Sequence, residues 1–199
     1  MHNNYPNLVL AYHGCDESVR DAVVMGGSLQ RSENPYDWLG NGIYFWENDE
    51  QRAYEWAVGL KARGKISRPA VLGTVLDLGK CLNLMERDSI DMLAVGYEVL
   101  KQRTEKFGLV MPANVNVSAS NDWLLRNRDC AVIEEVHQYL RENGIAPYDS
   151  VRGLFEEGER VYPGSGFRKK THIQICVINP NCVIGCFIPR KPDHRFAVP

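Results

Sequence analysis

The run GNGIYFW, at residues 40–46, places three aromatic side chains directly after a glycine turn. A strand that leaves such a turn can hold an aromatic ring rigidly, and glycine lets a ligand approach the main chain closely. Flat, electron-poor rings such as nicotinamide bind well between aromatic side chains. Because side chains alternate along a strand, Tyr44 and Phe45 point to opposite faces, which makes Tyr44 the stacking candidate and Phe45 a core residue.

A second group of candidate residues ends the first predicted strand, where His13 is followed by Gly14. An imidazole can hydrogen-bond a sugar hydroxyl, and glycine leaves its main-chain N–H and C=O open to a carboxamide. Cys15 comes next, but a nucleophilic thiol needs a base within about 3 Å, and nothing in the sequence indicates one. Far along the chain, Gln174 is a lone polar residue in the apolar run HIQICV.

These residues need a scaffold, and the hydrophobic pattern predicts both strands and helices. Strands are predicted at residues 7–14, 43–46, 69–79 and 148–158, and an Asn-Pro-Asn turn predicts a hairpin at 172–190. Helices are predicted at residues 16–27, 47–64, 86–107 and 121–143. Because the strands bracket the helices instead of alternating with them, we expect an α+β fold, with one domain over residues 1–190 and a loosely held tail at 191–199.

Composition sets limits on partners and location. The 199 residues carry a net charge of −2 and are 44% hydrophobic, which is ordinary for a globular protein and predicts no general attraction to polyanions. No apolar run approaches the ~20 residues that a membrane span needs, and no secretory leader is evident, so we expect a cytoplasmic protein without membrane contact. None of the six cysteines forms a C-x-x-C pair, which predicts free thiols and no metal site.

The motifs YHG and GNGIYF, the latter leading into a helix that contains Ala53, resemble those of the poly(ADP-ribose)-polymerase-like, or diphtheria-toxin-like, ADP-ribosyltransferases. The order of elements is similar over nearly the whole chain. Bacterial toxin members look most similar, including the RNA-modifying toxin of a toxin–antitoxin–chaperone phage-defence system. The resemblance implies an ADP-ribosyltransferase-like split β-sheet core, with NAD in the cleft between two small sheets and flanking helices.

The resemblance also implies roles for individual residues. The family's His-Tyr-Glu triad falls on His13, Tyr44 and Gln174. His13 would bind the nicotinamide ribose, Gly14 the carboxamide, and Tyr44 would stack on the nicotinamide. In relatives a glutamate stabilises positive charge on the ribose, and the neutral Gln174 supplies no such charge.

Other positions depart from the family pattern or could compensate for it. A family serine that touches the carboxamide falls on Arg52, and the second stacking tyrosine falls on Glu55, with Tyr54 or Trp56 as replacements after a small shift. The missing carboxylate could come from the stretch FEEG. Similar bacterial sequences read Phe-any-Glu-Gly there, which favours Glu157 over Glu156 as the catalytic residue.

The expected acceptor-facing loop carries three adjacent bases, Arg168, Lys169 and Lys170, which could bind a nucleic-acid phosphate backbone. Together with the resemblance, this favours an RNA acceptor and a toxin that needs an antitoxin partner. A protein acceptor, an RNA 2′-phosphotransferase and a catalytically silent NAD-binding or interaction module stay open as alternatives. Each residue also has a plain structural interpretation: His13 in the core, Gln174 at a strand edge, and Glu157 and the three bases on a solvated surface.

Overall fold

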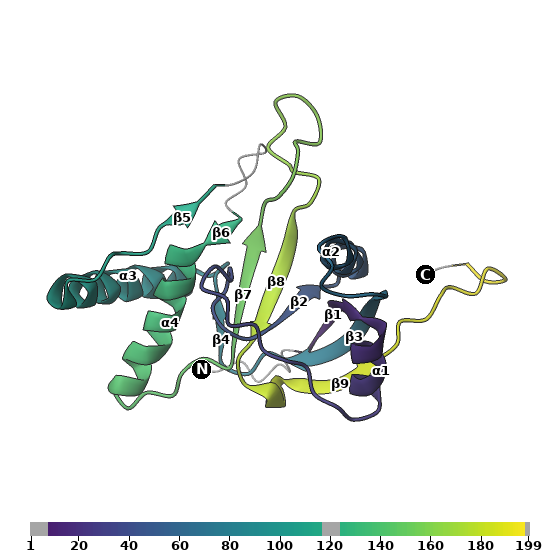
Figure 1. Cartoon of the computed structure of the whole chain (residues 1–199), viewed down its shortest axis with the longest axis horizontal. Coiled ribbons are helices and arrows are strands. Elements are labelled where there is room, and N and C mark those ends of the chain that lie inside the picture. Colours follow the sequence, from purple (N-terminus) through teal and green to yellow (C-terminus); the bar gives the residue numbers. More distant parts are fainter. Residues whose placement is uncertain (1–7, 117–123, 198–199) are drawn as a thin grey trace.

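The computed structural model describes residues 8–116 and 124–197, and the chain has the α+β fold that the sequence predicts (Figure 1). The helices are α1 (Glu17–Val24), α2 (Glu50–Ala62), α3 (Arg87–Phe107) and α4 (Asn127–Glu142), with a short 3-10 helix η1 (Pro180–Cys182). The strands are β1 (Leu8–Asp16), β2 (Ile43–Glu47), β3 (Pro69–Asp77), β4 (Cys81–Asn83), β5 (Asn114–Val115), β6 (Leu125–Arg126), β7 (Ser150–Phe155), β8 (His172–Val177) and β9 (Val183–Phe187).

Seven strands form one mixed sheet in the order β4-β7-β8-β2-β1-β3-β9, and β5 pairs with β6 separately. The pairing of β1 with β3 is long, running from Leu8–Asp77 to Asp16–Pro69. By contrast, β1 and β2 pair only at Ala11–Glu47 and Tyr12–Trp46. The two small sheets expected from the sequence are therefore joined into one, through a short pairing that we call the β1–β2 junction.

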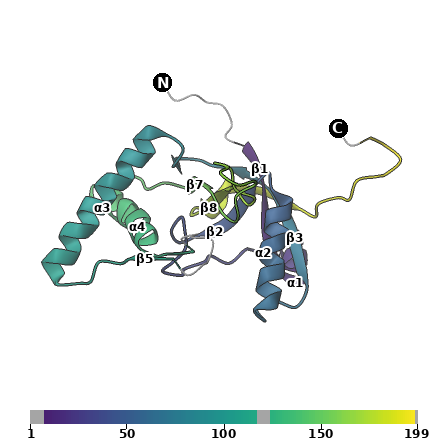
Figure 2. The ribbon, with the colours of Figure 1, turned by 90° about the horizontal axis from the view of Figure 1, so that it is seen from above.

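Helices lie over both ends of the sheet, with β7, β8 and β2 between them (Figure 2). Helix α2 crosses the β1–β3 end with its small buried residues Ala53 and Ala57. A Cβ atom on Gly14 would lie 2.0 Å from the main-chain oxygen of Ala53, so only glycine at this position lets α2 lie this close to β1. At the other end, α4 packs on the sheet and α3 packs on α4.

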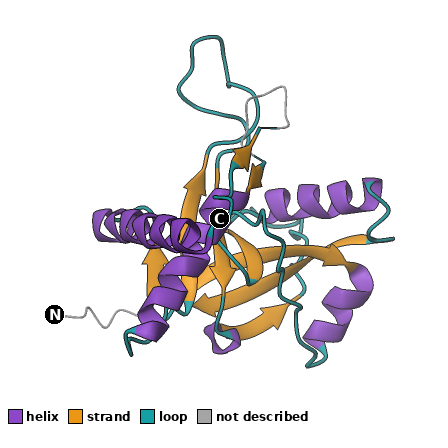
Figure 3. Cartoon of the chain, turned by 60° about the vertical axis from the view of Figure 1, so that its left-hand side comes forward, coloured by secondary structure: helices purple, strands orange, loops and turns teal. Residues whose placement is uncertain are grey.

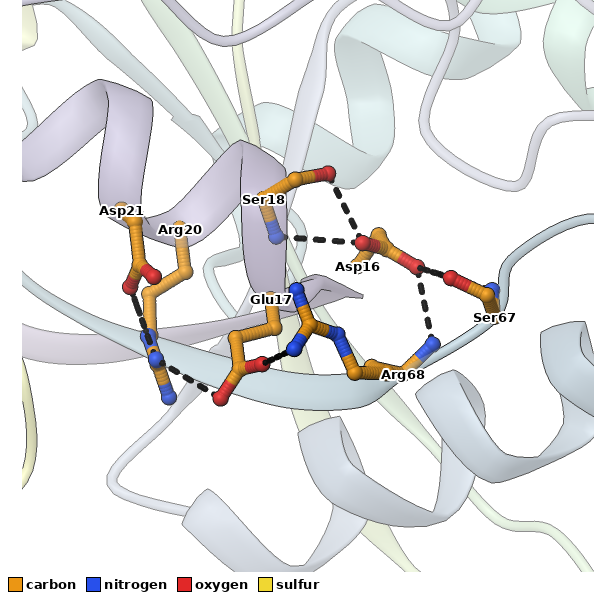
Figure 4. A network of polar contacts seen from close by, with 7 residues as sticks. All are labelled: Asp16, Glu17, Ser18, Arg20, Asp21, Ser67 and Arg68. Carbon is orange, nitrogen blue, oxygen red and sulfur yellow. Dashed lines mark hydrogen bonds and ion pairs between the residues drawn. The ribbon is translucent and has the colours of Figure 1, made fainter.

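The turn from β1 into α1 is fixed by Asp16, which caps the helix (Figure 4). One carboxylate oxygen accepts the N–H of Ser18, and the other accepts the N–H groups of Ser67 and Arg68. Main-chain donation from Arg68, followed by the Ser18 bonds, holds the pKa of Asp16 well below its usual range. This side chain therefore satisfies the first turn of α1 and ties it to the segment before β3.

Buried apolar clusters lie on both faces of the sheet. On one face Ala11, Phe45 and Ile175 meet in the middle of the sheet. On the other face Leu39, Val151 and Ile133 bring α4 against β7. The strand alternation assigned from the sequence to Tyr44 and Phe45 is what the two clusters show, because Phe45 lies in the first and Tyr44 packs on the second.

The prediction of a hairpin at residues 172–190 is wrong. Strand β8 pairs with β2 and β7, whereas β9 pairs with β3 at the far edge of the sheet. Asn179 starts η1 instead of a tight hairpin turn, and its side chain accepts the N–H of Asn181. The chain thus crosses three strands between β8 and β9, which lies at the edge of the sheet, and Figure 3 shows how strongly the strands of the sheet twist.

Strands β7 and β8 pair over six residues, and their connection continues outward as a ribbon that projects from the body of the protein (Figure 1). Main-chain bonds hold this ribbon, from Lys170 N–H to the Glu157 oxygen and from Lys169 N–H to the Glu159 oxygen. The segment expected to be a loop is therefore ordered from its base, which fixes where Glu157 lies.

Candidate active site at the β1–β2 junction

His13 spans the point where β1 and β2 part. Its Nδ1 lies 2.7 Å from the main-chain oxygen of Tyr44. Because a carbonyl only accepts, Nδ1 carries the proton and Nε2 keeps its lone pair in the neutral ring. Burial lowers the pKa of His13 below its ordinary value, so the ring is neutral at pH 7. Nε2 can therefore accept a hydrogen bond from a hydroxyl group.

Gly14 lies two residues after Tyr12, the last residue of β1 that pairs with β2, and the pairing pattern shows which way its main chain points. Leu10 accepts the N–H of Asn48 on the β2 side, whereas Arg68 accepts the N–H of Glu17 on the β3 side. In an antiparallel strand the bonding direction alternates, so Gly14 points toward β2 as Leu10 does. The last β1–β2 pair is Tyr12–Trp46, and the Tyr44 oxygen that would come next is taken by His13. The amide edge of Gly14 therefore faces the end of the β1–β2 pairing, and the residue itself is buried beneath α2.

The Tyr44 hydroxyl is held by two hydrogen bonds. The hydroxyl donates to the Gly40 oxygen at 2.7 Å and accepts the Leu39 N–H at 2.8 Å. Burial raises the pKa of this phenol far above its ordinary value. The ring packs on the buried cluster that contains Leu39 and Cys176. Tyr44 thus anchors the glycine turn that precedes β2, a structural task that goes beyond stacking on a ligand.

Gln174 lies in a row across the sheet, paired with Trp46 on β2 and Gly153 on β7. It is only 9% exposed. Because side chains alternate along β8, Gln174 points to the face opposite Ile175. His13 lies on the Ile175 face, with its ring 5.6 Å from that of Phe45. The structure therefore brings His13 next to Tyr44, but the His13 ring and the Gln174 side chain lie on opposite faces of the sheet.

Glu157 is held by an ion pair that the sequence did not suggest. Arg52, at the start of α2, donates from Nη2 to Glu157 at 2.8 Å and from Nη1 to Glu55 at 2.6 Å. The side chains of Arg52 and Glu157 are 13% and 17% exposed. The carboxylate proposed for catalysis and the arginine at the family serine position are thus direct partners, and they link α2 to the base of the β7–β8 ribbon.

His172 completes this cluster from the first residue of β8. Its side chain is fully buried, Nδ1 donates to the Lys170 oxygen at 2.6 Å, and the Glu157 carboxylate lies 4.0 Å from the same nitrogen. Burial lowers the pKa of His172 below its ordinary value, which favours the neutral ring. The sequence placed His172 after three bases, and the one indication of a buried role was its place at the start of an apolar strand.

Three buried nitrogen atoms around this cluster have no hydrogen-bond partner among the described residues. They are Nε1 of Trp46, Nε of Arg52 and Nε2 of His172. Leaving a buried polar group unpaired costs about 1–3 kcal/mol, so such groups mark strain or function. They come from β2, α2 and β8 and gather on the face of the sheet that α2 covers, near the β1–β2 junction.

The second stacking position stays a prediction. Tyr54 is 45% exposed on α2. Trp56 is 46% exposed, its ring lies 5.9 Å from that of Trp46, and the Arg63 guanidinium lies over it at 5.0 Å. Of the two, Trp56 is therefore the one that contacts an aromatic residue of β2.

Two of the three basic side chains of the β7–β8 ribbon form polar contacts within the ribbon itself. Arg168 donates to the Gly158 oxygen at 2.8 Å, and Lys169 pairs with the exposed Glu159 at 3.0 Å. The stem of Lys170 lies against Gly158. The basic cluster predicted from the sequence is thus not a row of uncommitted cations, because two members hold the ribbon's own oxygens.

The six cysteines are unpaired, and four of them are buried: Cys15, Cys130, Cys176 and Cys182. Burial raises the pKa of the Cys15 thiol to about 11, so it is not a ready nucleophile beside His13. In residues 8–116 and 124–197, no group of three His, Cys, Asp or Glu side chains is placed to hold a metal ion. Within the same ranges, every helix is too short or too polar to span a membrane.

Comparison of the chain with protein-family models finds no model that matches, and comparisons with curated proteins and with solved structures find no match either. The residues at the β1–β2 junction and around Glu157 are therefore the features that bear on function.

Proposed function

We propose that the protein is an ADP-ribosyltransferase that takes NAD as donor and transfers ADP-ribose to a macromolecule, with RNA as the favoured acceptor. One observation carries this proposal. At the β1–β2 junction the ladder stops, the neutral His13 takes the Tyr44 oxygen, and the Gly14 amide edge faces the end of the ladder. An edge of this kind suits a carboxamide, and the neighbouring Nε2 suits a sugar hydroxyl.

When bound, NAD supplies an ADP-ribosyl group whose bond to nicotinamide breaks, with the electron pair leaving on the nicotinamide nitrogen. Gly14 would orient the carboxamide and His13 a ribose hydroxyl. A carboxylate near the sugar would stabilise the positive charge that develops there. Glu157 is the candidate. It lies on the α2 side of the sheet, opposite the His13 ring, so the ribose would have to sit at the end of the β1–β2 pairing, between the two faces. The charge of Glu157 is balanced by Arg52 in this conformation, so Arg52 must turn away or share the carboxylate as the substrate binds.

Two specific observations favour a second candidate function. Gln174 is neutral, and Glu157 is already paired with Arg52. A chain with no uncommitted carboxylate at the site could bind NAD without cleaving it, as a silent binding or interaction module. A protein acceptor in place of RNA is the third candidate, and it shares the site and the donor.

Release of nicotinamide from NAD separates these possibilities. The protein is incubated with NAD labelled in the adenine moiety, alone and with RNA, DNA and protein fractions, and nicotinamide and labelled acceptor are both measured. We expect nicotinamide release and label in the RNA fraction. Label in the protein fraction alone would mean that the acceptor is a protein and not RNA. NAD binding without any release of nicotinamide would establish a module that binds NAD without cleaving it.

A further inference from the structure

A cavity of about 670 Å³ is lined by residues of α3, α4 and β7. Helices α3 and α4 lie at the other end of the sheet from α2 (Figure 2). One wall is a stripe of α3 with helical spacing, made by Ile90, Leu93, Ala94 and Tyr97. The opposite wall is Leu154 and Phe155 of β7. This volume is in the range of small-molecule sites, and the walls are mostly apolar with an aromatic contribution, as such sites usually are.

A smaller cavity of about 300 Å³ adjoins the first and is polar. The two share three lining residues, Arg126, Arg128 and Asp129 at the start of α4. An apolar space that meets a polar one at two arginines fits a ligand with a flat, largely apolar part joined to an anionic part. A nucleotide has this form, with its base in one space and its phosphate in the other.

The polar residues shared by the two cavities are held in place by their neighbours. The Arg126 guanidinium lies 4.6 Å from the ring centre of Trp38 and 4.9 Å from that of Phe155, and its Nη1 lies 3.5 Å from the Asp129 carboxylate. Arg128 Nε donates to the Pro112 oxygen at 2.8 Å. Such oriented arginines are suited to phosphate oxygens.

Asp129 and the first turn of α4 are tied to Asn114. Asn114 donates to the Asp129 carboxylate at 2.8 Å, and its side-chain oxygen accepts the N–H groups of Arg128 and Asp129. Phosphate binding would therefore rest on the arginine side chains and not on the end of the helix. Both Asp129 oxygens are thus engaged, one by Asn114 and one by Arg126, so a phosphate would have to compete with this carboxylate for Arg126.

The cavity wall is also the wall of the Glu157 cluster. Phe155 and Trp38 have their rings 6.1 and 6.3 Å from the ring of His172. His172 in turn lies 4.0 Å from the Glu157 carboxylate. One layer of aromatic side chains thus separates the larger cavity from the carboxylate that the proposed reaction needs.

We propose that these two cavities bind one nucleotide of a single-stranded RNA acceptor, with the base against Tyr97, Leu154 and Phe155 and the phosphate at Arg126 and Arg128. The strand must be single because a base can enter a pocket only when it is unstacked. The role as an acceptor site rests on the proposed function, but the binding itself is independent of NAD and can be measured without it.

The test measures the binding of fluorescently labelled single-stranded RNA oligonucleotides by anisotropy, with no NAD present. Ala94→Glu puts a charge into the larger cavity at an exposed helical position where glutamate is a good helix former. Val95→Glu is the matched control, since Val95 is the next residue of α3, is 43% exposed and lies outside the cavity lining. We expect Ala94→Glu to weaken binding about tenfold or more, as for loss of one stacked base, and the control to bind as the wild type does.

The phosphate contact has its own variant. Arg128→Ala should reduce the slope of log affinity against log salt by about one, whereas Lys101→Ala, at an exposed position of α3, should leave it unchanged. Equal binding by the Ala94 and Val95 variants, or no binding of RNA by the wild type, would overturn the proposal. So would complete loss of binding on replacing Arg168, Lys169 and Lys170 while Ala94→Glu binds normally.

Two further outcomes keep this inference distinct from the proposed function. If Ala94→Glu disrupts only the complex with a co-expressed partner protein, the cavity is a protein-docking site and the RNA proposal is wrong. NAD cleavage is measured separately without RNA, and we expect it to survive in Ala94→Glu. Absence of NAD cleavage by the wild type, both without RNA and with the RNA, DNA and protein fractions, would defeat the transferase proposal while leaving the RNA-binding result to stand.

Discussion

The imidazole of His13 donates a hydrogen bond to the main-chain oxygen of Tyr44 across the end of the β1–β2 pairing, with 2.7 Å between the two atoms. This bond replaces the ladder bond that Gly14 would otherwise make, so one side chain both joins two strands and leaves an amide edge unpaired by β2. The structural and the chemical roles of His13 are carried by different ring nitrogens, which makes them separable by mutation.

We predict that His13→Asn keeps the fold but lowers turnover at saturating NAD. The asparagine amide can donate to the Tyr44 oxygen in place of Nδ1, but it offers nothing in the position of Nε2. Loss of one hydrogen bond made in the transition state should lower kcat about tenfold or more. His13→Ala should lose both roles and also reduce the free energy of unfolding. A fully active His13→Asn enzyme would remove Nε2 from the mechanism.

Tyr44→Phe tests the anchoring of the glycine turn. The change leaves the Leu39 N–H and the Gly40 oxygen without their partner in a mostly buried position. We expect a loss of about 1–3 kcal/mol in the free energy of unfolding, measured by urea denaturation. Tyr54→Phe on the surface of α2 is the control and should have little effect. Equal stability of the two variants would mean that the Tyr44 hydroxyl does not hold the turn.

Glu157→Gln distinguishes a catalytically active transferase from a module that binds NAD without cleaving it. If the carboxylate stabilises charge on the ribose, its loss should lower the transfer rate by about 10²–10³ while calorimetry still detects NAD binding. Glu156→Gln is the control, because Glu156 is the exposed neighbour. A fully active Glu157→Gln enzyme together with an inactive Gln174→Ala enzyme would show that the amide alone carries the site.

Buried histidines predict loss of stability in mild acid. Burial lowers the pKa of His137, which is 2% exposed, to about 4, with the cations of Arg141 and Lys80 acting in the same direction. The unfolded chain, with a histidine pKa near 6.5, therefore binds a proton that the folded chain resists, and stability falls as the pH drops from 6.5 toward 4.

For His137 alone, the free energy of unfolding should fall by about 2 kcal/mol between pH 7 and pH 5. The lowered pKa values of His13 and His172 add to the loss in the same direction. Urea denaturation at both pH values measures the change, and His137→Leu should make it smaller. The same dependence in this variant would show that His137 does not cause it.

Several elements could be predicted from the sequence because their causes are local. Helix α3 was expected at residues 86–107 and runs from Arg87 to Phe107, ended by Gly108 in the left-handed conformation that glycine favours. Strand β2 was expected from a glycine turn followed by apolar residues, and it begins at Ile43. The start of α4 was placed six residues too early, in a region that partly lies outside the described residues.

The candidate site likewise has residues that short motifs predict and contacts that only the tertiary structure shows. His13, Gly14 and Tyr44 were found from short motifs, and β1 and β2 bring them together because both motifs lie at one junction. Tertiary structure alone decided the partnership of Arg52 with Glu157, 105 residues apart, and the separation of His13 from Gln174 by the sheet. Tertiary structure also decided that β9 pairs with β3 at the far edge of the sheet. A turn motif states where the chain bends, but the partner of a strand is chosen by packing and pairing between segments distant in the sequence.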